Sequence, residues 1–380
     1  MNKTGKRILS AVLAAVMLFC LTAVSASAKE SKMNIVLLDA GRKYFSPAQI
    51  ERIIDRMAED GYTDLELGVA NDGCRFLLDD MSLKANGVSY SDAQVRQAIL
   101  NGDEKYYDDP NGTALSQSEM DQLFSYAKGK GIRIIPLMES PGHMAAIVYA
   151  MQELGTKEGE PKINARTGNI SMNIESAKES NFVRALLFKY MKYFAGKGCE
   201  WFNMGCDEVS GYMPKDGKYD LYLSYVNCLA KSVKYLGMKP IMFNDILYYD
   251  GNGEGEVDPD IAVAYWNVPA GSVQPAATTE TIRKNGHALF NHNCVWYYVI
   301  GNNESPQSIS YNPFTYALSK ASMRTLHYTS FSDGTKYDGL LGACISFWCD
   351  TPQNTYKESL VLNLIDTFAE ENPEYFTPVA

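Results

Sequence analysis

Eight short, almost wholly apolar runs recur along the chain, and stretches with helical periodicity separate them. Runs this hydrophobic are typical of strands that are buried on both faces of a parallel sheet. The alternation of eight such strands with helices predicts an α/β fold, a (β/α)8 TIM barrel that forms a single domain. The predicted strands are Asn34–Asp39, Asp64–Val69, Arg133–Leu137, Trp201–Gly205, Pro240–Phe243, Ile261–Tyr265, His287–Asn291 and Gly342–Phe347.

The connecting helices have recognisable start signals. Ser46 is a candidate N-cap, Pro47 occupies the first helical position, and Gln49 completes a capping box. The apolar residues that follow recur at the spacing of a helix packed on a sheet. Segments Ser118–Lys130 and Ala177–Tyr193 show the same periodicity, so we expect helices there too.

The first 28 residues have the pattern of a secretory signal peptide. Basic residues precede an apolar stretch from Ile8 to Val24, and Ala26-Ser27-Ala28 supplies the small residues that signal peptidase recognises. We expect residues 1–28 to be removed and residues 29–380 to form one secreted catalytic domain. Retention of the apolar stretch as an anchor is the alternative. No later segment approaches the roughly 20 apolar residues that cross a bilayer, so no membrane attachment is expected after cleavage.

Acidic residues outnumber basic ones, 45 against 35, which gives a net charge of −10 at neutral pH. The charged residues of the leader are all basic, so the remainder of the chain is more acidic still. This balance argues against nucleic acid or anionic lipid as a partner. It is compatible with a neutral ligand such as a sugar.

The cysteines and histidines show no metal-ligand spacing. Seven cysteines follow the leader, an odd number without a C-x-x-C pair, which predicts neither a disulfide framework nor a zinc site. We therefore expect no metal or other cofactor. The seven cysteines are Cys74, Cys199, Cys206, Cys228, Cys294, Cys344 and Cys349, and the four histidines are His143, His287, His292 and His327.

Polar and aromatic side chains gather where the predicted strands end. The carboxyl ends of the strands form the active site of such a barrel, so these side chains are expected to share one face. Aromatic rings that contact C–H surfaces, together with acids that accept from hydroxyls, are typical of a sugar pocket. In chain order the candidates are Asp39, Arg42, Asn71, Asp72, Arg75, Glu139, His143, Asp207, Glu208, Asn244, Asp245, Trp266, Asn267, Trp296, Tyr297, Tyr298, Trp348 and Asp350.

The pair Asp207-Glu208 is the most informative of these candidates. Neighbouring side chains at the end of an extended strand point in different directions, so two acids can reach different atoms of one ligand. Carboxyl groups in unlike surroundings can hold unlike protonation states, as acid–base chemistry at neutral pH requires. The alternative is an ordinary solvated surface pair.

Four motifs at these strand ends resemble glycoside hydrolase family 20, which comprises β-N-acetylhexosaminidases and lacto-N-biosidases. They follow the family's order, and the resemblance covers essentially the whole chain after the leader. Longer matches look most like the streptococcal surface exo-β-N-acetylglucosaminidases. The four motifs are Leu38-Asp39-Ala40-Gly41-Arg42, Pro141-Gly142-His143, Gly205-Cys206-Asp207-Glu208 and Trp348-Cys349-Asp350, and the longer matches are Asn71–Met81, Ser140–Met144, Phe243-Asn244-Asp245 and Trp296–Val299.

The resemblance implies an exo-acting, retaining enzyme that releases terminal β-linked N-acetylglucosamine, with N-acetylgalactosamine as the alternative sugar, from oligosaccharides or glycoprotein glycans. Glu208 is implied to be the general acid and later the base that activates water. Asp207 is implied to orient the sugar's 2-acetamido group while its carbonyl oxygen attacks C1. This substrate-assisted route is an exception to the two-carboxylate scheme.

The resemblance also implies which residues hold the sugar. Arg42 and Asp350 are assigned to ring hydroxyls, a bidentate task that suits the planar guanidinium of Arg42. Trp266 and Trp348 are assigned to the pocket walls, and Asp245 to the substrate-binding set.

Four further residues complete the implied site. One of Tyr297 and Tyr298 donates to the acetamido oxygen; strand alternation lets only one face inward, and Tyr298 is slightly favoured as the catalytic residue, with Tyr297 in the substrate-binding set. His143 is placed behind the general acid in a polar relay with Asp72, which is also assigned to substrate binding.

Some positions depart from the family pattern. Cys206 stands where glycine is usual, Phe243 where tryptophan is common, and Asp350 where glutamate is common, which leaves the preference between C4 epimers open. Arg75 and Glu139 are expected to form a supporting ion pair.

Two other functions are compatible with the same residues. A lacto-N-biosidase, which releases a disaccharide, would need a more open pocket. A non-catalytic sugar-binding barrel is the alternative of another class, and the intact Asp207-Glu208 pair argues against it.

Overall fold

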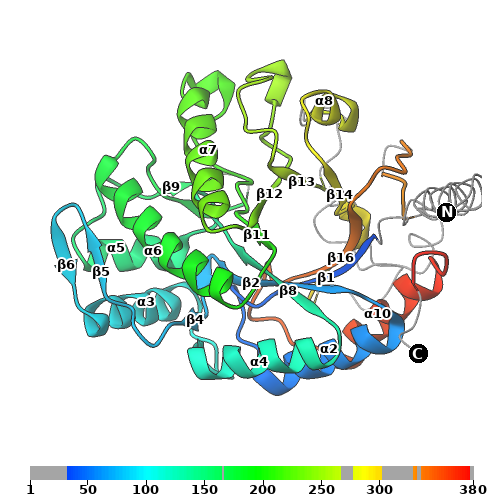
Figure 1. The fold of residues 1–380 in the computed structure, drawn as a ribbon. Helices are drawn as coiled ribbons and strands as arrows, with labels where there is room; N and C mark the ends of the chain where they lie inside the picture. The colour runs from blue at the N-terminus through cyan, green and yellow to red at the C-terminus, as the bar shows by residue number, and fades with distance from the viewer. Residues whose placement is uncertain (1–31, 165–166, 267–276, 302–327, 332–334, 377–380) are drawn as a thin grey trace, which may run out of the picture. The chain divides into compact units, whose positions relative to one another are not determined.

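The computed structural model describes residues 32–164, 167–266, 277–301, 328–331 and 335–376, and in this part of the chain eight parallel strands close into a barrel (Figure 1). Around the barrel the order is β1-β16-β14-β13-β12-β11-β8-β2, and β2 pairs again with β1. All eight predicted strands are present, so the predicted (β/α)8 fold is confirmed. Their bounds are β1 Met33–Asp39, β2 Asp64–Asn71, β8 Arg133–Met138, β11 Trp201–Asn203, β12 Lys239–Phe243, β13 Ala262–Tyr265, β14 Leu289–Asn291 and β16 Gly342–Trp348.

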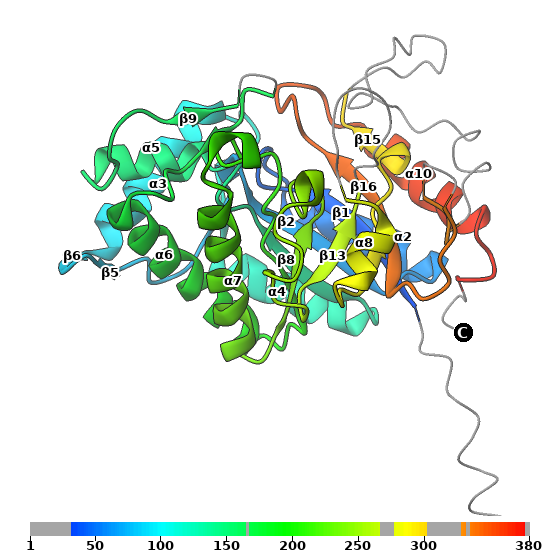
Figure 2. The same ribbon diagram turned by 90° about the horizontal axis from the view of Figure 1, so that it is seen from above.

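The helices lie on the outside of the strands (Figure 2). In the first of them, the Ser46 side chain accepts from the Gln49 backbone while the Gln49 side chain accepts from the Ser46 N–H, which confirms the predicted capping box. The described helices are α2 Pro47–Asp60, α3 Asp92–Tyr107, α4 Gln117–Gly129, α5 Ala145–Glu153, α6 Ala177–Gly196, α7 Tyr219–Tyr235, α8 Thr279–Lys284 and α10 Glu358–Glu370.

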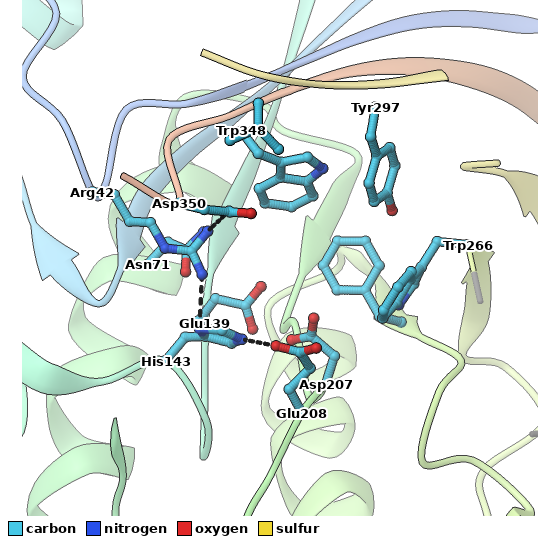
Figure 3. A pocket seen from close by; sticks show the side chains of 12 residues that line it. Arg42, Asn71, Glu139, His143, Asp207, Glu208, Trp266, Tyr297, Trp348 and Asp350 are labelled. Carbon is cyan, nitrogen blue, oxygen red and sulfur yellow. Dashed lines mark hydrogen bonds and ion pairs between the residues drawn. The ribbon is translucent and has the colours of Figure 1, made fainter. Parts of the chain in front are cut away.

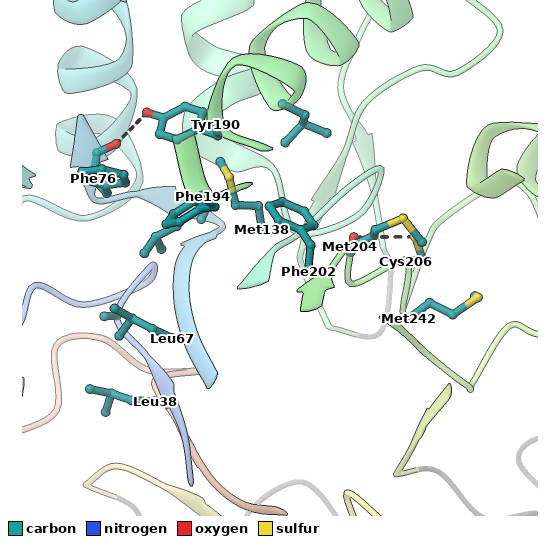
Figure 4. Close-up of a cluster of buried hydrophobic side chains, with 14 of the residues drawn as sticks. Leu38, Leu67, Phe76, Met138, Tyr190, Phe194, Phe202, Met204, Cys206 and Met242 are labelled. Carbon is teal, nitrogen blue, oxygen red and sulfur yellow. Dashed lines mark hydrogen bonds between the residues drawn. The ribbon is translucent and has the colours of Figure 1, made fainter. Parts of the chain in front are cut away.

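Strand alternation divides the apolar residues into two cores. Inward side chains such as Leu37, Ile135 and Ile241 fill the barrel. Their outward neighbours, including Leu38 and Phe202, pack against the helices in the larger core that Figure 4 shows in part. Both sets are buried, so the barrel is a packed scaffold and its function is confined to one end.

Two excursions at the carboxyl ends of the strands shape that end. One runs from β2 to α4 through β3 Gly73–Cys74, β4 Phe76–Leu77, β5 Leu83–Ala85, β6 Val88–Tyr90, α3 and β7 Leu115–Ser116, and the other runs from β8 to α6 through α5, β9 Lys162–Ile163 and β10 Ile170–Ser171. The Asp72 N–H donates to the His143 carbonyl at 2.6 Å, and the Ala146 N–H donates to the Asp72 carbonyl at 2.7 Å. Backbone hydrogen bonds alone therefore hold Asp72 and His143 next to one another.

Within the described ranges, no helix has both the length and the apolar character needed to cross a membrane. The seven cysteines among the described residues are all free thiols. The predicted signal peptide, Asn267 and His327 lie outside the described residues.

Candidate active site

The carboxyl ends of the barrel strands surround a pocket of about 470 Å³, a figure that includes the open space at its mouth (Figure 3). Strand-end residues that are remote in the sequence meet there, as predicted. The pocket is lined by Arg42, Asn71, Glu139, His143, Asp207, Glu208, Phe243, Trp266, Tyr297, Val299, Trp348 and Asp350.

Arg42 is the cationic centre of one side of the pocket. Its guanidinium lies 3.1 Å from a carboxylate oxygen of each of Asp39, Asp72 and Asp350. Burial opposes the charge of Arg42, but the three carboxylates outweigh burial and raise its pKa well above the ordinary value. The Asp350 side chain is 43% exposed, so its carboxylate stands at the rim, where a ligand can reach it.

A relay connects Asp72, His143 and Glu208. Nδ1 of His143 lies 3.1 Å from Asp72 Oδ2, and Nε2 lies 3.4 Å from Glu208 Oε2. Burial alone would lower the pKa of His143, yet the Asp72 charge and the hydrogen bonds to Asp72 and Glu208 raise it well above its ordinary value. Nδ1 of His143 also lies 2.9 Å from Nη2 of Arg42, which can only donate, so the imidazole stands between Arg42 and the two carboxylates. The predicted position of His143 behind Glu208 matches this geometry; Asp72 stands behind Arg42 and His143 and is not among the residues that line the pocket.

Asp207 is paired with Glu139. Burial, followed by the charge of Asp207, raises the pKa of Glu139 well above its ordinary value, and the two side chains are hydrogen-bonded. Glu139 is thus the protonated partner and donates to an Asp207 carboxylate. A Cβ on Gly205 would collide with the Glu139 carboxyl group, so glycine at this position leaves room for the pair.

The predicted ion pair between Arg75 and Glu139 is wrong. Arg75 is buried, and its guanidinium donates to the backbone carbonyls of Arg42, Thr113 and Tyr107 at 3.3, 2.9 and 2.6 Å. It ties the excursion after β2 together, because a fork of five donors can satisfy several loop carbonyls at once.

Asp245 was expected to bind substrate, and this prediction is wrong. Its side chain is buried, does not line the pocket, and accepts a hydrogen bond at 3.0 Å from the Glu208 backbone N–H. Burial and the charges of Asp207 and Glu208 raise the pKa of Asp245 well above its ordinary value. Asp245 therefore holds the backbone of Glu208 in place.

Aromatic rings form the wall of the pocket. Trp266 stacks with Tyr297 at a centroid distance of 6.0 Å, and Tyr297 meets Trp348 edge to face at 5.6 Å. Phe243 lies 6.0 Å from Trp348. The Tyr297 hydroxyl is buried and has no hydrogen-bond partner among the described residues, so this donor is available to a ligand.

The preference for Tyr298 over Tyr297 is wrong. Both residues lie in the short strand β15 Tyr297–Val299, which pairs with β16 in register Tyr297↔Ser346 and Tyr298↔Phe347. Tyr298 points outward into the core between barrel and helices and packs on Phe347 at 6.3 Å. Tyr297 is the tyrosine that lines the pocket.

The backbone around the acids is in an unusual conformation. Non-glycine residues at positive φ among the described residues include Asp72 (54°), His143 (50°), Cys206 (71°) and Glu208 (46°). The left-handed region disfavours such side chains, and its concentration here marks a functional site. The positive φ of Cys206 also explains why glycine, which adopts this conformation without steric cost, would fit at that position.

Two asparagines that were not predicted as site residues also contact the relay: Asn169, directly before β10, and Asn164, directly after β9. Asn169 Nδ2 lies 3.0 Å from His143 Nε2 and 3.4 Å from Glu208 Oε2, and Asn164 Nδ2 donates to the Glu208 carbonyl at 2.9 Å. The other site residues were predicted because they follow the carboxyl ends of barrel strands. Neither asparagine does, so its position along the chain gave no signal.

Comparisons with known proteins agree with this geometry. The profile described as glycosyl hydrolase family 20, catalytic domain, matches residues 35–371. Two solved structures of the pneumococcal virulence factor StrH, described as an exo-β-D-N-acetylglucosaminidase with tandem catalytic modules, are each 36% identical to this chain with a TM-score of 0.84. They cover 92% of this chain and 86% and 85% of the solved chains.

More distant proteins match as well. The crystal structure of Dispersin B is 20% identical, with a TM-score of 0.67 over 91% of this chain and 99% of that chain, and shows the same fold. The β-hexosaminidase subunit A1 of Dictyostelium discoideum is 26% identical over 171 residues, which are 42% of this chain and 30% of that protein. The match thus spans less than a third of that relative.

The relay predicts a pH-dependent contribution to stability. Burial opposes ionisation of Asp72, but the charges and hydrogen bonds of His143 and Arg42 outweigh burial and lower its pKa from 3.8 to about 2. A group with a depressed folded-state pKa stabilises the fold above its unfolded pKa, and this contribution is lost as pH falls toward the folded one. The difference between the folded and unfolded pKa of Asp72 corresponds to about 2 kcal/mol of folding free energy.

We therefore expect the free energy of unfolding of the native chain, relative to Asp72→Asn, to fall by about 2 kcal/mol between about pH 5 and pH 2. Urea unfolding at several pH values measures it, and the exposed Asp79→Asn variant controls for loss of a carboxylate. Parallel stability curves for the native chain and Asp72→Asn would contradict the assigned ion pairs.

Proposed function

Since the chain belongs to glycosyl hydrolase family 20 and is a glycoside hydrolase, we propose that it is an exo-acting, retaining β-N-acetylhexosaminidase that releases terminal β-linked N-acetylglucosamine. One observation carries the proposal: Asp207, Glu208 and the unpartnered hydroxyl of Tyr297 converge on one pocket. A carboxylate, an acid and a neutral donor are what a 2-acetamido sugar needs when its own amide is the nucleophile.

In the first step, the acetamido carbonyl oxygen forms a bond to C1 while the glycosidic C1–O bond breaks. Asp207 accepts from the acetamido N–H and stabilises the positive charge that develops on the amide. Tyr297 donates to the acetamido oxygen and orients it toward C1. Glu139, protonated, holds Asp207 in its anionic form, so that the carboxylate that faces the amide keeps its charge.

Glu208 protonates the departing glycosidic oxygen in the same step. In the second step it takes a proton from water, the water oxygen bonds to C1, and the cyclic intermediate opens to regenerate the acetamido group. Two displacements at C1 retain the anomeric configuration. His143 donates to Glu208 from one side, and Asp245 fixes its backbone from the other.

The opposite side of the pocket suits the sugar ring. Figure 3 shows Arg42 and Asp350 on the side of the pocket away from Asp207 and Glu208. In the proposal they bind the outer hydroxyls of the ring, and the face of Trp348 packs on its C–H surface. An ion pair at this end supports release of one terminal sugar, because a second sugar beyond it would have to displace Arg42 or Asp350.

We also propose that the enzyme is exported by its N-terminal leader and acts on glycans outside the cell. The support is the basic, apolar and small-residue sequence of residues 1–28.

The first test is replacement of the general acid. Glu208→Gln should lower kcat by about 100- to 10,000-fold on a GlcNAc-terminated oligosaccharide. The loss should be much smaller on a dinitrophenyl glycoside, whose leaving group departs without a proton. Glu200→Gln is a matched control, because Glu200 is exposed at the opposite end of β11 and pairs with Lys239 at 2.7 Å. Equal losses on both substrates would contradict the role of Glu208.

The second test addresses the amide. Asp207→Asn removes the charge that supports the attacking acetamido group, so kcat should fall by about 100- to 1,000-fold. A thiazoline mimic of the cyclic intermediate should inhibit the native enzyme and bind the variant more weakly. A native enzyme that is insensitive to the thiazoline, or that cleaves glucosides as fast as N-acetylglucosaminides, would rule out the substrate-assisted route.

The third test separates the two tyrosines. Tyr297→Phe removes one hydrogen bond to a developing charge, worth about 1.5–3 kcal/mol, so kcat/KM should fall by about 10- to 150-fold. Tyr298→Phe is the matched control in the adjacent residue of the same strand and should keep kcat/KM nearly unchanged. The reverse ranking would contradict the assignment of Tyr297.

A further inference from the structure

Below the sugar pocket, the interior of the barrel contains polar residues where branched apolar side chains are usual. Glu66 projects inward from β2, Asn203 from β11, and Cys344 and Ser346 from β16, while His292 follows the end of β14. All five are buried, with relative exposures of 0%. None of them lines the sugar pocket, so the catalytic mechanism does not use them.

The hydrogen bonds of this cluster are incomplete. Glu66 Oε1 accepts from Asn203 Nδ2 at 2.5 Å, but Glu66 Oε2 and both ring nitrogens of His292 have no hydrogen-bond partner among the described residues. Cys344 Sγ has contacts of ordinary length for sulfur, 3.4 Å to the Ile345 carbonyl and 3.6 Å to Ser346 Oγ, and a hydrogen bond with the Leu37 backbone. A fully buried imidazole without partners is costly, so the cluster is incomplete as an internal hydrogen-bond network.

The separations within the cluster fit a shared ion better than a direct bond. Glu66 Oε2 lies 3.5 Å from His292 Nε2, beyond a normal hydrogen bond. One ligand atom each from Glu66, His292 and Cys344 lie within 4.8 Å of one another. Tetrahedral zinc, with bonds near 2.0–2.3 Å, separates its ligand atoms by roughly 3.3–3.8 Å.

The charges of these three ligands also balance the charge of a divalent cation. A carboxylate from Glu66 and a thiolate from Cys344 together neutralise a dication, and the neutral imidazole of His292 adds no charge. A dication held this way is electrically balanced in an apolar interior, where an unbalanced charge would be expensive. One nitrogen, one sulfur and one oxygen ligand is a donor set that zinc accepts and that calcium or magnesium does not.

We propose that Glu66, His292 and Cys344 bind one divalent transition-metal ion, of which Zn²⁺ is the best fit, as a structural centre inside the barrel. Glu66 and Cys344 come from β2 and β16 and His292 from the residue after β14, so no spacing in the sequence signals the three ligands. The His292 ring lies 5.9 Å from the ring of Phe243, which lines the sugar pocket. The ion thus supports the pocket floor from below and takes no part in glycoside hydrolysis.

The test is the metal content of the full chain after refolding, because a site this deep fills as the barrel closes. Protein refolded with Zn²⁺ and then dialysed against a chelator should retain about one zinc per chain, measured by plasma mass spectrometry. His292→Gln and Cys344→Ser should each lower that content at least tenfold. Cys199→Ser is the control, because it removes a buried thiol at the other end of β11, outside the cluster.

Cobalt gives a second measurement that needs no variant. Native protein refolded with Co²⁺ should show a thiolate-to-cobalt charge-transfer band, which is absent when the thiol is not a ligand. This reading stays decisive if His292→Gln or Cys344→Ser fails to fold. Zinc content far below one per chain, together with no charge-transfer band, would overturn the proposal and leave trapped water as the partner of His292. Neither measurement depends on the glycosidase activity.

Discussion

Three of the carboxyl groups at the pocket end of the barrel depend on one buried cation, Arg42. Arg42 stands between Asp39, Asp72 and Asp350, each 3.1 Å away. Three carboxylates this close would repel one another and resist burial without a positive centre. The guanidinium stays charged at any physiological pH, and its planar fork bonds in several directions at once. His143 and Arg42 together lower the pKa of Asp72, and the charge of Asp72 in turn raises the pKa of His143.

The remaining acids divide their tasks by environment. Glu139 and Asp245 are buried beside other carboxylates, and burial together with those charges raises their pKa values. Burial raises the pKa of Asp207 too, but the hydrogen bond from Glu139 lowers it, and Asp207 is the member of the pair that faces the pocket with Glu208. Chemically identical groups thus become a donor and an anion through burial and proximity alone.

Much of this could be predicted from the sequence, for physical reasons that also explain the errors. Strands buried on both faces are continuous apolar runs, so the eight strands and the residues at their ends could be predicted. The choice between Tyr297 and Tyr298 could not be predicted from the sequence, because both are large aromatic residues. Only the register of β15 on β16 decides which of them faces inward. The carbonyl partners of Arg75 belong to an excursion whose path no local pattern encodes.

The predicted position of the Asp207-Glu208 pair at the pocket rested on an incomplete geometric reason. The sequence placed the pair at a strand end, with alternation separating the side chains. In the structure β11 ends earlier, at Asn203, whose side chain accepts from the Gly205 N–H at 2.9 Å. Gly205, Cys206 and Glu208 then all take positive φ values. This turn brings both acids into one pocket, whereas a continued strand would send alternate side chains to opposite faces. Backbone strain at the turn therefore lets two adjacent acids face one pocket, as the roles proposed for Asp207 and Glu208 require.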